Sequence, residues 1–122
     1  MQRFHNIYEK QREFENLIIS KSKSLPNKLL SEFDEKEKVA FSKELILLTH
    51  TELGELIDAI GNFKLHKTQK DSGEGKSVID EIADCLIFIL NLSLTHGFSS
   101  EQLLEAIEKK QQINFKRQEE GY

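Results

Sequence analysis

The segment from Ser77 to Leu94 is apolar on nearly every side, and it contains neither Lys nor Arg. A run of this composition predicts a helix that is buried all round. An acid pair, Glu81 and Asp84, nevertheless lies within it, with its two members three residues apart. An unpartnered buried carboxylate is so unfavourable that it takes up a proton, pairs with a base or coordinates a metal. We therefore expect the fold to bring a partner to these two acids.

Helical periodicity extends over most of the chain, which has one proline and few of the alternating β-branched residues that are typical of strands. Pro26 ends the first helix, because proline has no amide donor and restricts the residue before it. Two sequence pairs, Asp34 with Glu37 and Ser99 with Gln102, predict capping boxes at helix starts. The chain therefore contains its own local signals for where helices begin.

These signals predict an all-α fold, a bundle of four main helices. The expected helices cover about 3–22, from Asp34 to about 61, about 76–96, and from Ser99 to about 118, with a short helical turn at 27–32. Gly97 suits a left-handed stop after the third helix. The polar, glycine-rich stretch 68–75 predicts an exposed loop. Helices of this length leave apolar faces that a single chain does not cover, so a second copy is expected to complete the bundle.

Size and charge restrict the class of protein. A 14.2 kDa chain has enough apolar residues for one core and too few for two, so residues 1–122 are expected to form a single domain. The formal charge of -4 gives no general electrostatic reason to bind nucleic acid or an anionic membrane. Early charged residues and the absence of a membrane-length apolar stretch predict a cytoplasmic location. Cys85 lies in the apolar segment and is expected to be a core residue.

A second acid pair, Glu52-Leu-Gly-Glu55, follows the apolar run Leu45-Ile-Leu-Leu48. Residues three apart on a helix project about 60° from each other, so each pair presents two carboxylates on one face. The nearest cations in sequence, Lys43 and Lys64, are too far away for local helical salt bridges. One such pair is common on a solvated helix face, but two pairs in strongly apolar helices favour a cation site between those helices.

Four carboxylates suit Mg²⁺ or Mn²⁺, whereas zinc would recruit His or Cys at spacings that this chain does not have. Divalent ions in such a site typically bind phosphate oxygens of a substrate, so phosphoryl chemistry is expected. A polyphosphate also needs cationic contacts. Candidates are Lys64, Lys67, Lys110 and Arg117, although each of these alone is also consistent with a solvated charged surface.

In the order, spacing and helical context of its acid pairs, Glu52-x-x-Glu55 and Glu81-x-x-Asp84, the chain resembles the all-α nucleoside triphosphate pyrophosphohydrolases. This superfamily includes MazG-like enzymes and dimeric dUTPases. The C-terminal sequence 110–122 also resembles the K-x-x-x-N-x-x-R-Q-x-x-G-Y ending that is common among dimeric dUTPases. The resemblance covers most of the chain.

Two further elements are similar to dimeric dUTPases. Gln11-x-x-x-Glu15 resembles a Q-x-x-x-D element that those enzymes use near the base, and the segment from Asn62 to Lys67 resembles their lysine-bearing segment after the first acid pair. Glu15 stands where that family usually has Asp, and Thr51 stands where MazG-like proteins often have an additional Glu. The chain is also shorter than typical dimeric dUTPases. These departures leave the substrate open and are compatible with a broader specificity.

The resemblance implies hydrolysis of a nucleoside triphosphate to the monophosphate and pyrophosphate, with dUTP favoured and dCTP or a broad range of dNTPs next. It implies that the four acids bind Mg²⁺ and that Glu55 also orients or deprotonates the attacking water. The substrate contacts that it implies are Lys64, Lys67, Lys110, Asn114, Arg117, Gln11 and Glu15. It also implies a homodimer or homotetramer.

Two other classes remain open from the sequence. A catalytically silent nucleotide-binding or sensing module would keep the metal site without turnover. A structural helical oligomer would instead pair its acids with Lys or Arg from a partner subunit. Dependence on Mg²⁺ separates these classes, because a ligand stabilises only a protein that binds it.

Overall fold

The computed structural model describes residues 2–61 and 77–121. Within these ranges the protein contains four α-helices and one short 3₁₀ helix, with no strand. The elements are α1 (Gln2–Lys21), η1 (Leu30–Glu32), α2 (Glu35–Ile60), α3 (Val78–Thr95) and α4 (Ser100–Glu119). The predicted all-α class and the number of main helices are therefore confirmed. The expected loop at 68–75 and the two lysines Lys64 and Lys67 lie outside the described residues.

Both predicted capping boxes are present. The Asp34 carboxylate accepts a hydrogen bond from the Glu37 amide at 2.8 Å and begins α2. The Ser99 hydroxyl accepts one from the Gln102 amide at 3.1 Å and begins α4. In each box the third residue of the helix returns a bond to the amide of the cap, so amide donors at the helix start are satisfied from both directions. Gly97 has φ of 80°, as expected for the stop after α3.

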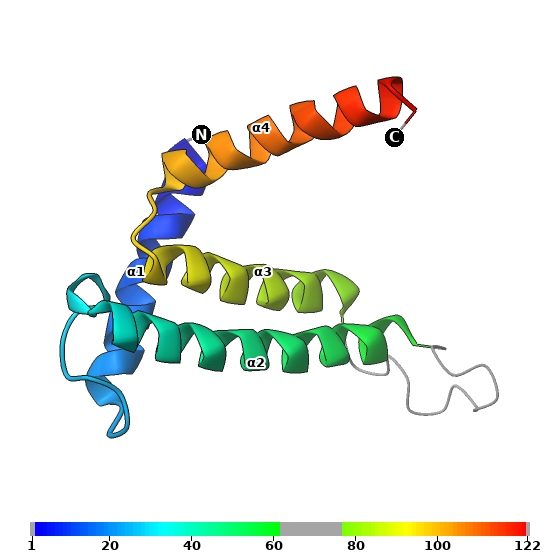
Figure 1. The fold of residues 1–122 in the computed structure, drawn as a ribbon. Coiled ribbons are helices and arrows are strands. Elements are labelled where there is room, and N and C mark those ends of the chain that lie inside the picture. The colour runs from blue at the N-terminus through cyan, green and yellow to red at the C-terminus, as the bar shows by residue number, and fades with distance from the viewer. Residues whose placement is uncertain (1, 62–76, 122) are drawn as a thin grey trace.

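The helices α2 and α3 lie side by side along most of their length, and this is the largest contact between elements (Figure 1). The helix α1 crosses one end of this pair, next to η1. The helix α4 starts at the same corner, packs on α1 and diverges from α3 toward its C-terminus (Figure 1). The buried core lies where α1, η1 and the adjoining ends of α2 and α3 meet, and it consists of Tyr8, Ile19, Leu30, Phe33, Phe41, Leu45 and Leu94.

The expectation that the third helix is buried all round is wrong for the single chain. Only one face of α3 packs on α2, and α1 covers only the C-terminal end of α3, so many large apolar side chains of α3 remain exposed. These are Val78, Ile79, Ile82, Leu86, Ile87 and Ile89. Cys85 is buried, as predicted.

Apolar side chains on α2 are exposed in the same way, which agrees with the expectation that a single chain leaves apolar faces uncovered. The exposed large apolar residues of α2 are Val39, Ile46, Leu47, Leu48, Leu53, Ile57 and Ile60. No described helix has the length and apolar character that are needed to cross a bilayer.

Candidate metal centre and nucleotide site

Three of the four predicted metal ligands converge between α2 and α3. Glu52 comes from α2, and Glu81 and Asp84 come from the first two turns of α3. One carboxylate oxygen from each of the three lies within 4.8 Å of the others. Glu52 and Glu81 are half-buried and Asp84 is exposed, so the cluster opens to solvent on one side. The antiparallel pairing of the two helices thus unites acids that are remote in sequence.

Glu55, the fourth predicted ligand, lies one turn after Glu52 and is half-buried. Its oxygens are not among those that converge within 4.8 Å. Glu55 is still close enough to contribute to the local charge, since it acts electrostatically on Glu52. The four acids therefore form one electrostatic group, with three carboxylates in contact range and a fourth beside them.

Burial is the largest influence on Glu52, and together with the negative charges of Asp84, Glu55 and Glu81 it raises the pKa of that carboxyl. Within the described ranges, the ion pairs involve other acids, and none reaches Glu52, Glu81 or Asp84. Mutual repulsion without a basic partner makes the cluster unfavourable when it is ionised. Oxygen ligands in this arrangement fit a hard divalent cation such as Mg²⁺ or Mn²⁺.

The buried thiol of Cys85 adjoins this cluster. Burial and the charges of Glu52, Glu81 and Asp84 raise the pKa of Cys85. A thiol in these surroundings stays protonated near neutral pH and is therefore a poor nucleophile and a poor metal ligand. The geometry supports a structural role for Cys85 and an all-oxygen donor set for the cluster.

The predicted contacts on α4 are not next to the acids of their own chain. Lys110, Asn114 and Arg117 recur at helical spacing on one side of α4, and all three are exposed. The helix packs on α1, and its C-terminal half diverges from α3 (Figure 1). A role for these residues at the acid cluster of the same chain would need a different position of α4.

The predicted pair on α1 does face the interior. The Gln11 amide donates a hydrogen bond from Nε2 to Oδ1 of Asn91 on α3 at 2.8 Å. Glu15, one turn later, is only 6% exposed. Burial raises the pKa of the Glu15 carboxyl. Sequence reasoning missed Asn91, although a lone amide within the apolar run of the third helix was a visible signal.

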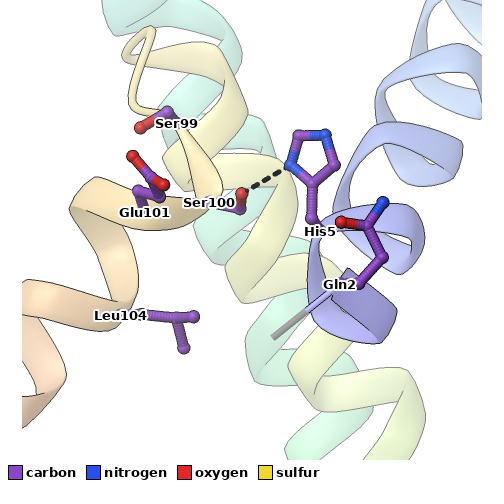
Figure 2. A pocket seen from close by; sticks show the side chains of 6 residues that line it. All are labelled: Gln2, His5, Ser99, Ser100, Glu101 and Leu104. Atoms are coloured by element: carbon purple, nitrogen blue, oxygen red, sulfur yellow. Dashed lines mark hydrogen bonds between the residues drawn. The ribbon is translucent and has the colours of Figure 1, made fainter.

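A separate pocket of about 440 Å³ lies between the N-terminal ends of α1 and α4 (Figure 2). His5 and Ser100 meet in it, with 2.8 Å between the His5 Nδ1 and the Ser100 Oγ. Most residues that line the pocket come after the C-terminal end of α3 in the sequence, whereas the acid cluster lies near the N-terminal end of that helix. Its lining includes Glu101 and neither Lys nor Arg, so it lacks the cationic contacts that a polyphosphate needs.

A family model described as dUTPase matches residues 3–96. The chain belongs to the dUTPase family. The match includes α1, α2 and α3, and hence both acid pairs and the Gln11–Glu15 element. The helix α4, with its three predicted substrate contacts, follows the matched region. Among curated proteins and among solved structures, no match to the chain was found.

Proposed function

We propose that this member of the dUTPase family hydrolyses deoxynucleoside triphosphates to the monophosphate and pyrophosphate, with dUTP as the favoured substrate. The main support for this proposal is the convergence of Glu52, Glu81 and Asp84 between two helices of the matched region. Three carboxylates with oxygens within 4.8 Å of one another, and with no ion pair to a base within residues 2–61 and 77–121, suit a cation that also binds phosphate oxygens. dCTP, or a broad range of dNTPs, comes next in the order of expected substrates.

Glu52, Glu55, Glu81 and Asp84 would hold Mg²⁺, with Mn²⁺ as a substitute. When bound, the metal would offset the negative charge of the triphosphate and lower the pKa of water. Burial and the repulsion of the neighbouring acids raise the pKa of Glu52, and this supports the assignment, because a bound cation would offset that repulsion.

Glu55 is proposed as the general base. Its carboxylate lies beside the cluster and would orient a water molecule and accept a proton from it. The water oxygen forms a new bond to phosphorus as the bridge between the α- and β-phosphates breaks. Pyrophosphate and the nucleoside monophosphate leave, and the proton on Glu55 returns to solvent.

Cationic and amide side chains would hold the rest of the substrate. We assign phosphate and sugar contacts to Lys110, Asn114 and Arg117, with weaker support from Lys64 and Lys67, and base or sugar contacts to Gln11 and Glu15. In this proposal the α4 residues act in an assembly in which a copy of α4 approaches the acid cluster.

Self-association fits the surface of the chain. Large exposed apolar patches mark interaction sites, and α2 and α3, which pack side by side, together expose thirteen large apolar side chains. We propose a homodimer or homotetramer, located in the cytoplasm, in which helices of a second copy cover these faces. In such an assembly, α4 of one copy would lie next to the acid cluster of another copy.

The decisive experiment measures pyrophosphate and monophosphate release from dUTP, dCTP, dATP, dGTP, TTP and the ribonucleotides, with Mg²⁺ and with EDTA. Magnesium-dependent turnover confined to dUTP supports a dUTPase, and broad turnover supports a housekeeping pyrophosphohydrolase. Binding of nucleotide with Mg²⁺ but without turnover would leave the sensing module as the function. Absence of both would favour the structural oligomer.

The variant Glu55→Gln separates these classes further. An enzyme should lose turnover by at least ~10²-fold while its fold and assembly persist, because the substitution removes the proton acceptor and one proposed metal ligand but keeps the size of the side chain. Glu44→Gln, which changes an exposed acid about three turns earlier on the same helix, is the matched control and should keep full activity. Loss of assembly in Glu55→Gln alone would contradict the catalytic role and support the structural reading.

A further inference from the structure

Polar side chains lie at helical spacing on one side of α1, and two of them form hydrogen bonds to α3. Tyr8, Gln11 and Glu15 follow each other at helical spacing on one side of α1. The Tyr8 hydroxyl lies 2.7 Å from the Ser93 Oγ and donates a hydrogen bond to the Phe98 carbonyl oxygen at 2.8 Å. The Tyr8 hydroxyl therefore has its hydrogen-bond partners within the protein. Gln11 and Glu15 come next along the same side of α1.

Asn91 connects this side of α1 to the metal-binding helix. It is 2% exposed, and its Oδ1 accepts the Gln11 Nε2 hydrogen at 2.8 Å. Asn91 follows Asp84 by seven residues, which returns it to nearly the same side of α3, roughly 10 Å further along the axis. That separation is comparable to the reach of a nucleotide from its phosphates to its base. A ligand whose phosphates lie at the acids can therefore extend its base toward Gln11.

Glu15 lies in the same region and is a candidate ligand contact. Only 6% of the residue is exposed, and its carboxylate makes no hydrogen bond or ion pair within the described part of the chain, although its oxygens are not fully shielded from solvent. A buried carboxylate without a partner is unfavourable. It lies one turn from Gln11 on the side of α1 that faces the interior, so an incoming N–H donor would satisfy it.

We propose that Asn91 is a positioning residue that fixes the side-chain amide of Gln11 for recognition of the base. Because Nε2 of Gln11 donates to Asn91, the Oε1 of the same amide is directed elsewhere and presents an acceptor to a ligand. An acceptor selects a base that carries an N–H at the contact. Uracil and thymine carry a hydrogen on N3, whereas N3 of cytosine is itself an acceptor, so an acceptor placed against N3 favours uracil-type over cytosine-type bases. This inference rests on the proposed function.

Three variants separate this role from a structural one. Asn91→Leu keeps the side-chain volume approximately and removes the acceptor, while Asn91→Asp keeps an acceptor oxygen for the Gln11 amide. Ser93→Ala is the matched control, because it removes the hydroxyl contact of α3 to Tyr8 of α1 and leaves the Gln11 pair intact. All are compared at a temperature below the lowest Tm of the set.

Two measurements are made on each protein: the ratio of kcat/KM for dUTP to that for dCTP, and the ratio of the Kd values for dCMP and dUMP. We expect the wild type to prefer uracil. Asn91→Leu should lose at least ~10-fold of that preference, which corresponds to the loss of a contact of about 1.4 kcal/mol. Asn91→Asp and Ser93→Ala should retain the preference. The change must appear in the ratio, because a general loss of stability lowers kcat/KM for dUTP and for dCTP by the same factor.

Several results would overturn the proposal. Retention of the uracil preference in Asn91→Leu, or a cytosine preference in the wild type, contradicts it directly. Loss of the preference in Asn91→Asp would mean that Gln11 accepts from Asn91 instead of donating to it. If turnover is absent but the binding preference for dUMP depends on Asn91 as described, the proposed hydrolysis fails and the positioning role stands. If neither mononucleotide binds and no triphosphate is hydrolysed, both fail.

Discussion

Glu52 on α2 and Asp84 on α3 face each other across the helix pair with carboxylate oxygens within 4.8 Å. Like charges at this separation oppose the packing of the two helices, and Asp84 is the first of the charged neighbours that raise the pKa of Glu52. The longest helix contact in the protein therefore contains a local repulsion near one end. A divalent cation between the acids reverses the sign of that interaction.

Magnesium should stabilise the folded protein. A ligand that binds only the folded state at 100 times its Kd adds ~2.7 kcal/mol of stability, so we expect Tm to rise with Mg²⁺ relative to EDTA. Asp84→Asn should lose most of this rise and all measurable turnover. The matched control is Asp80→Asn, which changes an exposed acid one turn earlier on the same helix and should keep the shift. An equal magnesium shift in both variants would count against the proposed metal site.

In the metal-free protein, Glu52 and Glu15 should each contribute a loss of stability as the pH rises through the carboxyl range. A folded-state pKa above the unfolded value means that stability is greatest below the unfolded pKa and falls as the pH rises toward the folded pKa. Glu52 has such a raised pKa because of burial and its acidic neighbours, and Glu15 has one because of burial. We expect the difference in urea midpoint between Glu52→Gln and wild type in EDTA to grow between about pH 4 and pH 7.

Glu44→Gln serves as the control for this titration, since Glu44 is exposed on α2 and should follow the wild type. Saturating Mg²⁺ should reverse the effect and make the wild type the more stable protein near neutral pH. A pH-independent difference between Glu52→Gln and wild type would show that carboxylate repulsion does not govern the stability of this cluster.

Lys110 should contribute to substrate binding. A hydrogen bond to a charged group contributes about 1.5–3 kcal/mol, so Lys110→Ala should raise KM at least ~10-fold. Lys109→Ala removes the neighbouring exposed lysine on a different side of α4 and should change KM little. Steady-state kinetics with dUTP compares the two. Equal effects of the two substitutions would indicate a general electrostatic attraction and not a specific phosphate contact.

A charge on the outer face of α2 should prevent assembly. Leu47 is 68% exposed in the single chain, and burial of an unpaired carboxylate in a helix interface is unfavourable. Light scattering after size exclusion should therefore show Leu47→Glu as a monomer, with turnover reduced. Lys43→Glu, one turn earlier on the same helix, is the charge-changing control and should assemble normally. Assembly of Leu47→Glu would place the interface on another surface.

Helix boundaries were predictable because the signals that set them are local. Asp34 and Ser99 cap helices through bonds to residues three positions ahead, and Gly97 stops a helix through its own backbone conformation. Each signal acts within one or two turns, so the four observed α-helices begin and end within about two residues of the expected positions, whereas the short turn expected from residue 27 begins at Leu30.

Relations between distant elements were harder to predict. The acid pairs indicated a site between two helices, and three of the acids do meet there, but the sequence contained no information on the direction of α4. The apolar composition of α3 suggested burial on all sides, yet composition does not tell which chain provides the cover. Asn91 was missed because its partner, Gln11, is 80 residues away and only the folded chain brings them together.

The uncovered apolar faces of α2 and α3 have a consequence for how the protein is made. A newly synthesised copy carries thirteen exposed large apolar side chains on these two helices until something covers them. Such surfaces attract one another without specificity, so the interval between folding and pairing is when the chain is most prone to aggregate. Its yield in a cell then depends on synthesis rate and temperature, and a slow supply of chains at low temperature favours soluble product.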